Sequence, residues 1–210
     1  MEKYHKIKTV HLRDEKTHKL TNVFRNETVE YLKDNEWVFT EKIDGMNIRV
    51  CWNGIDVSFF GRSDNAQIPK QLGIRLKELF LGEENEQMFE QKFGETSVIL
   101  FGEGFGAKIQ SGGAYSPTQE FILFDVKIND TYLDRESVNN IAMYFNVGTV
   151  PIIDECNTIE SAVAYVKTNP QSYIGKKDME GVVGVPKLRL IDFKGERVIV
   201  KIKYKDYREE

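Results

Sequence analysis

The chain is 210 residues long, and its 29 Lys and Arg residues against 33 Asp and Glu residues give it a net charge of -4. Hydrophobic residues make up 40% of it, which is enough for a core and excludes a disordered or fibrous chain. A mean hydropathy of -0.44 without a long apolar run excludes a transmembrane span, and the polar N-terminus excludes a secretory signal. Only Cys51 and Cys156 are present, so no disulfide framework or cysteine zinc site can form. We therefore expect a soluble, cytoplasmic globular protein without a membrane partner.

The first 35 residues are polar and irregular, and we interpret them as a surface wrap or short helix leading into the core. From Trp37 onward, short stretches rich in β-branched and aromatic residues predict strands, and Asn53-Gly54 is a two-residue hairpin signal between two of them. The strands predicted in this part of the chain are 37–43, 47–52, 55–60, 98–101 and 121–128.

Apolar residues at helical spacing predict a helix over 68–81, and further helices are predicted over 135–145 and 158–168. The chain closes with strands predicted at 181–185, 188–193 and 197–204. Because hairpins dominate and a few helices interrupt them, the predicted fold class is α+β with mainly antiparallel sheets. We expect a single domain over 1–210, in which residues 1–35 form the N-terminal wrap and residues 36–204 the core.

The first candidate for chemistry is Lys42, which ends a predicted strand and is followed by an Asp44-Gly45 turn. This arrangement holds the amine at the edge of a sheet. A lysine acts as a covalent nucleophile when burial or neighbouring cations favour its neutral form. The structural alternative is an exposed lysine beside an ordinary turn.

Two carboxylates beside glycines are the next candidates. Glu103 lies in the segment Phe101–Gly106, which matches neither the dinucleotide fingerprint nor a phosphate-binding loop but lets a ligand approach closely. Glu180 opens the apolar stretch Gly181–Val185. An exposed carboxylate at the end of a strand explains either residue equally well.

The last candidates are Lys201 and Lys203, which stand two positions apart on a predicted strand and so point to the same face. Like charges placed in this way repel unless water or an anion lies between them. A phosphate site and a solvated sheet face are the two interpretations.

Together these elements carry a family resemblance. In chain order they are Lys42-Ile-Asp-Gly, Gly61-Arg62, Phe101-Gly-Glu-Gly-Phe-Gly, Phe121-Ile-Leu-Phe-Asp125, Glu180-Gly-Val-Val and Lys201-Ile-Lys203. The set resembles the covalent nucleotidyltransferase superfamily of polynucleotide ligases and mRNA capping enzymes, and it is most similar to the phage-type ATP-dependent RNA ligases that repair RNA. Six elements in order are far more specific than any one of them alone.

The resemblance implies an ATP-grasp-like nucleotidyltransferase domain that uses ATP and Mg²⁺ or Mn²⁺. Lys42 would attack the α-phosphorus of ATP, form a lysyl-AMP and release pyrophosphate. The AMP would then pass to an RNA 5′-phosphate, and a 3′-hydroxyl would displace it to seal the strand. Such transfers need mainly placement and charge stabilisation from the protein.

The resemblance also implies a role for each matched residue. Lys201 and Lys203 would be catalytic with Lys42, because they contact the α-phosphate and stabilise the charge that grows in the transition state. Glu180 would help to hold the metal ion through water. The implied nucleotide contacts are Glu41 and Ile43 bordering the adenine, Phe121 stacked on the base, Arg62 and Glu103 at the ribose, and Asn47 near the phosphate.

Two departures from related enzymes affect the expected substrate. Asn47 stands where many DNA ligases carry an arginine, which favours RNA over DNA. Only seven residues follow Lys203, so we expect no C-terminal OB-type domain and stronger self-adenylylation than end joining. We expect an accessory protein or the N-terminal basic residues to supply the RNA contacts that such a domain would make. These residues are Lys3, His5, Lys6, Lys8, His11, Arg13, Lys16, His18 and Lys19.

Three alternative functions stay open: a DNA nick ligase, a GTP-dependent capping-type guanylyltransferase, and a noncatalytic nucleic-acid-binding module. Retention of the whole set of charged candidates favours catalysis, because a scaffold that only binds does not need them. A nick, a single-stranded end and a tRNA-like break are all open as the substrate.

Overall fold

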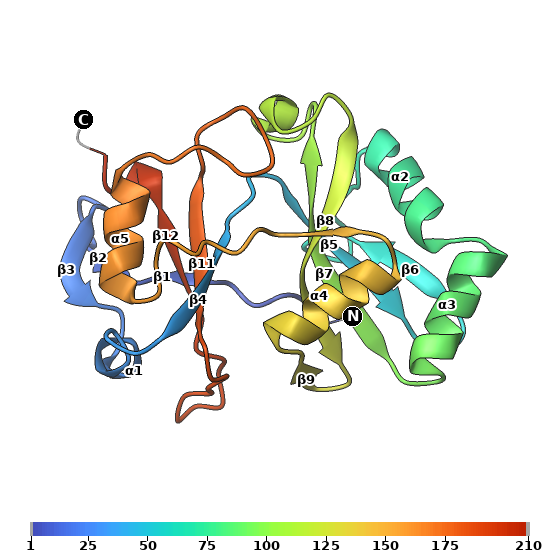
Figure 1. Cartoon of the computed structure of the whole chain (residues 1–210), viewed down its shortest axis with the longest axis horizontal. Coiled ribbons are helices and arrows are strands. Elements are labelled where there is room, and N and C mark those ends of the chain that lie inside the picture. The colour runs from blue at the N-terminus through green and yellow to red at the C-terminus, as the bar shows by residue number, and fades with distance from the viewer. Residues whose placement is uncertain (1, 209–210) are drawn as a thin grey trace. The chain divides into compact units, whose positions relative to one another are not determined.

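The computed structural model describes residues 2–208 (Figure 1). The chain divides into two compact units and passes from one to the other three times. Unit 1 consists of residues 2–4 and Asp44–Val150, and unit 2 of His5–Ile43 and 151–208. The expectation of a single domain over 1–210 is not tested by this division and stays a prediction.

Unit 1 is built on one sheet with the strand order β10-β8-β7-β5-β6, and β9 also pairs with β8. Neighbouring strands are antiparallel except for β10, which runs parallel to β8. The antiparallel prediction therefore holds for most of this sheet. The strands are β5 (Met46–Trp52), β6 (Val57–Phe60), β7 (Val98–Gly106), β8 (Gln119–Ile128), β9 (Thr131–Tyr132) and β10 (Gly148–Thr149).

Three helices pack on one face of this sheet: α2 (Lys70–Phe80), α3 (Glu83–Phe93) and α4 (Arg135–Tyr144) (Figure 1). Side chains alternate along the strands, so Ile48, Val50 and Leu100 point into the core beneath these helices. The residues between them point to the other face, where Phe101 and Cys51 form a smaller apolar cluster. A short 3₁₀ turn, η1 (Gly112–Ala114), follows β7.

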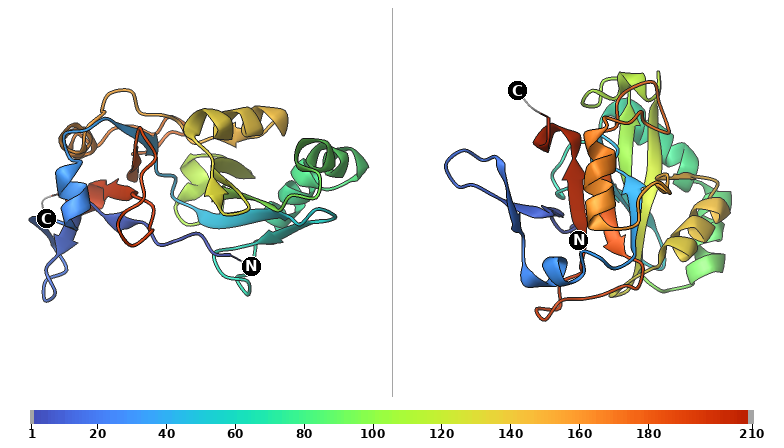
Figure 2. Two further views of the ribbon diagram at one scale, coloured as in Figure 1. Left: turned by 90° about the horizontal axis from the view of Figure 1, so that it is seen from below. Right: turned by 60° about the vertical axis from the view of Figure 1, so that its left-hand side comes forward.

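Unit 2 contains a four-stranded sheet with the order β1-β12-β11-β4. Helix α5 (Ile159–Lys167) shares a core with it, and the capping box of Thr158 and Ser161 starts this helix. The hairpin β2–β3 (blue in Figure 2), the short helix α1 and the 3₁₀ turn η2 complete the unit. The remaining bounds are β1 (Lys8–Thr9), β2 (His11–Arg13), β3 (Leu20–Phe24), α1 (Glu27–Tyr31), β4 (Trp37–Glu41), β11 (Gly181–Pro186), β12 (Val200–Lys203) and η2 (Tyr204–Asp206).

Most predicted elements are confirmed to within a few residues, including the hairpin turn at Asn53-Gly54. There the Asn53 side chain accepts hydrogen bonds from the amides of Ile55 and Asp56, and Gly54 adopts a φ of 95°. The predicted short helix of the first 35 residues is present as α1, whereas the strands β1, β2 and β3 were not predicted.

Two predictions about elements differ from the structure. Helix α3 was missed, because only Met88, Phe89 and Phe93 of its residues are apolar. The predicted strand 188–193 is irregular, with a single bridge between Ile191 and Arg197. Among residues 2–208, no helix has both the length and the apolar character needed to cross a bilayer.

Candidate active site

In unit 2, three adjacent strands bring two of the candidate lysines into one row. The amide of Lys42 donates a 2.9 Å hydrogen bond to the carbonyl of Gly181, which extends the β4–β11 ladder by one residue. Gly181 in turn pairs with Lys203 on β12. Since side chains in one row across a sheet point to the same face, the side chains of Lys42 and Lys203 meet on one side of β11.

The carboxylate of Glu180 lies between these two ammonium groups. Its Oε2 is 2.5 Å from Lys42 Nζ, and its Oε1 is 2.5 Å from Lys203 Nζ. The three side chains are only 15–25% exposed. This carboxylate therefore neutralises one of the two charges and holds the Lys42 amine in a fixed position.

Lys201 adds a third cation to the same face. It stands two residues before Lys203 and pairs with Val183, which pairs with Thr40. Burial, then the charges of Lys203 and Lys42, lower the pKa of Lys201 below its ordinary value. Within the described part of the chain, the ammonium group of Lys201 makes no hydrogen bond or ion pair. This face of unit 2 consequently carries uncompensated positive charge, which suits an anionic ligand.

Gly181 makes this arrangement sterically feasible. Its φ is +150°, and a side chain there would overlap the carbonyl oxygen of Ile202 and approach Lys203 Cα to 2.7 Å. The glycine thus lets β11 and β12 lie close together at the point where Glu180 must reach both lysines.

Glu41 and Ile43 were predicted to border the adenine, and the structure gives the Glu41 side chain a different position. Glu41 pairs with Val182, a residue of the unit 2 core, on the face opposite Lys42. Its buried carboxylate accepts hydrogen bonds from Ser172 Oγ at 2.5 Å and Tyr173 N at 2.9 Å, and burial raises its pKa. Because side chains alternate along a strand, the Glu41 carboxylate anchors the 172–173 loop. Ile43 is buried as well.

In unit 1, Asn47 on β5 and Glu103 on β7 are direct cross-strand neighbours. The Oδ1 atom of Asn47 is buried and has no hydrogen-bond partner within residues 2–208. Gly45 passes so close to Glu103 that a side chain there would meet the Glu103 Cγ at 2.9 Å. A buried amide without a partner beside a carboxylate fits a ligand that offers hydroxyl groups.

The aromatic residue predicted to stack on the base lies on a different face of the unit 1 sheet from Glu103. Phe121 pairs with Gly104 and lies in the helix-covered core, with its ring edge-to-face against Phe80 at 5.5 Å. It is 5% exposed and lines the cavity beside α2, on the sheet face opposite Glu103. The half-buried ring of Phe124 instead packs with Phe101 on the face that carries Glu103. A bulge in β8 opposite Phe101 and Gly102 produces this shift, which the sequence pattern does not reveal.

Arg62 is exposed, and a residue missed by the sequence analysis holds the loop that carries it. The fully buried guanidinium of Arg49 donates to the carbonyl of Gly61 at 2.9 Å and to Asp64 Oδ1 at 2.8 Å. It also lies 5.3 Å from the centre of the Phe60 ring. The sequence did contain a signal for Arg49. It lies two positions after Asn47 on a predicted strand, which places a charged side chain on the face of Asn47.

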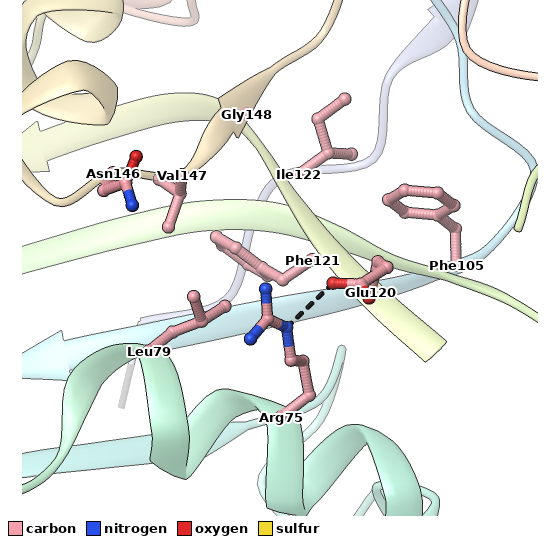
Figure 3. A pocket seen from close by; sticks show the side chains of 9 residues that line it. All are labelled: Arg75, Leu79, Phe105, Glu120, Phe121, Ile122, Asn146, Val147 and Gly148. Atoms are coloured by element: carbon pink, nitrogen blue, oxygen red, sulfur yellow. Dashed lines mark hydrogen bonds and ion pairs between the residues drawn. The ribbon is translucent and has the colours of Figure 1, made fainter. Parts of the chain in front are cut away.

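Unit 1 also contains a cavity of about 200 Å³ between α2 and the first residues of β8 (Figure 3). Of the predicted site residues it includes only Phe121, and an ion pair of 2.8 Å between Arg75 and Glu120 lies beside it. Its lining residues are Arg75, Leu79, Phe105, Glu120, Phe121, Ile122, Asn146, Val147 and Gly148.

The predicted metal ligand Glu180 stands without other carboxylates around it. Residues 2–208 contain no group of three or more His, Cys, Asp or Glu side chains arranged to hold a metal ion. A single carboxylate does fit Mg²⁺ or Mn²⁺ when substrate phosphates and water supply the other ligands. This donor set therefore matches a metal ion that arrives with a nucleotide.

Among the N-terminal basic residues, Lys3 belongs to unit 1 and the others to unit 2. Arg13 is bound to Asp206 at 2.7 Å, and the ring of His11 lies against Phe24 at 4.9 Å. Burial lowers the pKa of His11, so a smaller fraction of this histidine carries a positive charge than of an exposed histidine. Lys16 and Lys19 are exposed.

Comparisons with known proteins show which family and which solved structures the chain resembles. A family model described as RNA ligase matches residues 35–203. No curated protein sequence matches the chain. A lysine-to-methionine variant of a Naegleria gruberi RNA ligase, solved with AMP and Mn, is 20% identical with a TM-score of 0.66, covering 86% of this chain and 53% of that one. The same ligase solved with PPi is 22% identical with a TM-score of 0.62, covering 86% and 52%. This chain thus spans about half the length of these solved relatives, and the likeness shows the shared fold.

Proposed function

Because the chain belongs to the RNA ligase family, we propose that it is the adenylyltransferase domain of an ATP-dependent RNA ligase, with an ATP-grasp-like nucleotidyltransferase fold. The observation that carries the proposal is the row of Lys42, Glu180 and Lys203, with Lys201 on the same face. Nucleophile, neighbouring cations and a single carboxylate are what lysine-dependent nucleotidyl transfer requires.

In the first step, Lys42 Nζ attacks the α-phosphorus of ATP. A P–N bond forms, the bond from the α-phosphorus to the bridging oxygen breaks, and pyrophosphate leaves. The ammonium must lose a proton before it attacks. As the nucleotide enters, that proton passes to Glu180 Oε2, which is in direct contact with the ammonium group, and from there to water. Lys201 and Lys203 stabilise the negative charge that grows on the α-phosphate oxygens, since they are fixed in place before the reaction.

Binding of the nucleotide exchanges the partners of these lysines. Phosphate oxygens take the place of the Glu180 carboxylate beside Lys42 and Lys203, and the released carboxylate is then available for a water-mediated contact with Mg²⁺ or Mn²⁺. The metal, when bound, neutralises charge on the phosphates. Lys201, which has no anionic partner in the described structure, gains one.

Most of the proposed contacts with the nucleoside come from residues of unit 1. Asn47 and Glu103 would bind the ribose and phosphate edge of the nucleotide, and Arg62 would contact the ribose from its loop. The ring that contacts the base is Phe124 in place of Phe121, because Phe124 shares the face of Glu103. Ile43 and the backbone of Glu41 would border the adenine.

The remaining two steps use RNA. An oxygen of a 5′-phosphate attacks the α-phosphorus of the lysyl-AMP, the P–N bond breaks, and Lys42 is regenerated. A 3′-hydroxyl then attacks the activated 5′-phosphate, a phosphodiester forms, and AMP leaves. The substrate is therefore an RNA break with 5′-phosphate and 3′-hydroxyl ends.

The test is self-labelling with α-labelled ATP, and separately with α-labelled GTP, in the presence of Mg²⁺. The protein is first treated with pyrophosphate to remove any prebound AMP. Wild type should form an acid-labile adduct with ATP, and Lys42→Ala should form none, because it lacks the amine. Addition of 5′-phosphorylated RNA should then transfer the label to RNA.

Control variants decide how the result is interpreted. Lys205→Ala removes an exposed lysine close to Lys203 and should label like wild type. An adduct with GTP alone would indicate a capping-type enzyme, and transfer to DNA in preference to RNA would indicate a DNA ligase. Folded wild type that forms no adduct with either nucleotide would overturn the proposed activity.

A further inference from the structure

Residues 2–4 cross the open face of the unit 1 sheet, on the side that carries Glu103 and Phe124. Figure 1 shows the N-terminus beside this sheet, and the contacts of Glu2 and Tyr4 belong to unit 1. Neither residue is part of the motifs on which the proposed function depends. Their contacts nevertheless converge on side chains that support the nucleotide site.

Tyr4 is the centre of an aromatic cluster. Its ring lies 4.9 Å from that of Phe101, 5.0 Å from that of Phe124 and 6.0 Å from that of Tyr132. The contact with Phe124 is edge-to-face, at an interplanar angle of 75°. Such contacts stabilise one orientation of each ring beyond simple burial. Tyr4 thus restricts the rotation of the ring that we assign to the base.

The hydroxyl of Tyr4 adds a polar anchor. It donates a 2.9 Å hydrogen bond to Oδ2 of Asp125, a carboxylate that is 2% exposed. Asp125 directly follows Phe124, at the bulge of β8. Because a buried carboxylate without donors is costly, this bond fixes the local backbone as well as the side chain.

Glu2 makes the second attachment. Its carbonyl accepts a 2.8 Å hydrogen bond from Arg49, whose other nitrogens hold the loop of Arg62. Its carboxylate lies 2.5 Å from the ammonium of Lys127, which is 8% exposed. Residues 2–4 are therefore bonded to the supports of two separate nucleotide contacts.

We infer that Tyr4 is a positioning residue for adenine recognition, because its ring and hydroxyl hold Phe124 and Asp125 in the geometry that receives the base. Glu2 assists through Arg49. This inference rests on the proposed function and adds to it a role for a segment outside the motifs. It assigns Tyr4 to binding of the base, with no part in the chemical step at Lys42.

Since Tyr4 affects only the binding of the base, its variants should weaken ATP binding and leave the chemical step unchanged. Tyr4→Phe keeps the ring and loses the hydrogen bond to Asp125, so it should raise the KM for ATP in self-labelling about 3- to 10-fold with kcat nearly unchanged. Tyr4→Ala should raise it further. Inorganic tripolyphosphate, which has no base, should bind all variants equally.

A binding measurement makes the test independent of turnover. In a Lys42→Ala background, calorimetry should give a dissociation constant for ATP that rises in Tyr4→Phe by the same factor. Tyr4→Ala and Phe124→Ala should be non-additive, since one acts through the other. Tyr31→Phe, which alters a tyrosine that is 84% exposed, is the matched control and should change nothing.

The outcomes separate the two proposals. Wild type that never labels would overturn the proposed function, and this inference with it. Wild type that labels while both Tyr4 variants keep its affinity for ATP would overturn the inference alone. Equal weakening of ATP and tripolyphosphate, or additive effects with Phe124→Ala, would show that Tyr4 only stabilises unit 1, and thermal melts of each variant would confirm it.

Discussion

At the scale of single residues, Lys201 shows how a binding site costs stability. It is half-buried and near two other lysines, and the charges of Glu180 and Asp206 offset this only in part, because the pKa of Lys201 is still lowered. A folded protein gains nothing from such an arrangement in the absence of a ligand. This loss of stability is consistent with a role in binding phosphate, because a bound anion neutralises the lysine charge and so restores the lost stability.

Replacing Lys201 with methionine should therefore separate stability from activity. Lys201→Met keeps a similar length and removes the charge, so we expect the Tm to rise, on the order of 2 °C, and self-labelling to fall about 100-fold or more. Differential scanning calorimetry and the labelling assay measure the two effects on one sample. Lys205→Met is the control and should change neither; a Tm that falls in Lys201→Met would contradict the argument.

The same residue predicts a pH dependence. Since the pKa of Lys201 is lowered in the folded state, the unfolded chain keeps this proton at pH values where the folded chain has lost it. The free energy of unfolding should therefore increase as the pH rises from the lowered pKa of the folded state toward the pKa of lysine in the unfolded chain. Urea unfolding of wild type and Lys201→Met at pH 7 to 10 isolates this gain, which the variant should lack.

At the scale of elements, the site depends on the close approach of β11 and β12. Gly181→Ala would force a methyl group into the carbonyl of Ile202 in a left-handed region of the backbone. We expect a loss of stability of about 3 kcal/mol or more, with a disrupted row of Lys42, Glu180 and Lys203. Gly73→Ala is the matched control, because a side chain there meets no atom within 4 Å.

Chemical denaturation and the labelling assay check this expectation. If Gly181→Ala unfolds at the same denaturant concentration as Gly73→Ala, the close approach does not matter for folding. If it is as stable as wild type and labels fully, the glycine is not needed to seat Glu180. Either result would contradict the role assigned to this position.

The elements also show what the sequence could and could not predict. Strands β4, β5 and β11 and helix α5 follow from period-two alternation, periodicity and a cap, which are local signals. Helix α3 is too polar on most of its surface to produce such a signal. Residues 188–193 alternate like a strand, yet they form only an isolated bridge.

The candidate site follows the same division between local and non-local information. The position of Lys42 before an Asp-Gly turn is a local feature, and so is the shared face of Lys201 and Lys203. That Glu180 bridges two lysines depends on which strands are neighbours. That Phe124, and not Phe121, lies on the face of Glu103 depends on one bulge. Residue order alone does not specify strand pairing or bulges, so these features required the structure.

At the scale of the whole molecule, the net charge of -4 must be reconciled with the polyanionic substrate that we propose. Binding of RNA depends on local cations, and the exposed side chains of Lys16 and Lys19 between β2 and β3 are candidates for contacts with phosphates. ATP is small and is held mainly by groups in the site. The two substrates should therefore respond differently to salt.

We expect the transfer of AMP to RNA to weaken steeply with salt, and self-labelling to weaken much less. With about three phosphate contacts, RNA affinity should fall roughly 20- to 40-fold between 50 and 200 mM KCl, because each neutralised phosphate releases a counterion. Single-turnover transfer from preformed lysyl-AMP protein at subsaturating RNA measures this effect. Replacing both Lys16 and Lys19 with alanine should make the salt dependence shallower and leave self-labelling unchanged, whereas an unaltered slope would assign RNA binding to other cations of the chain.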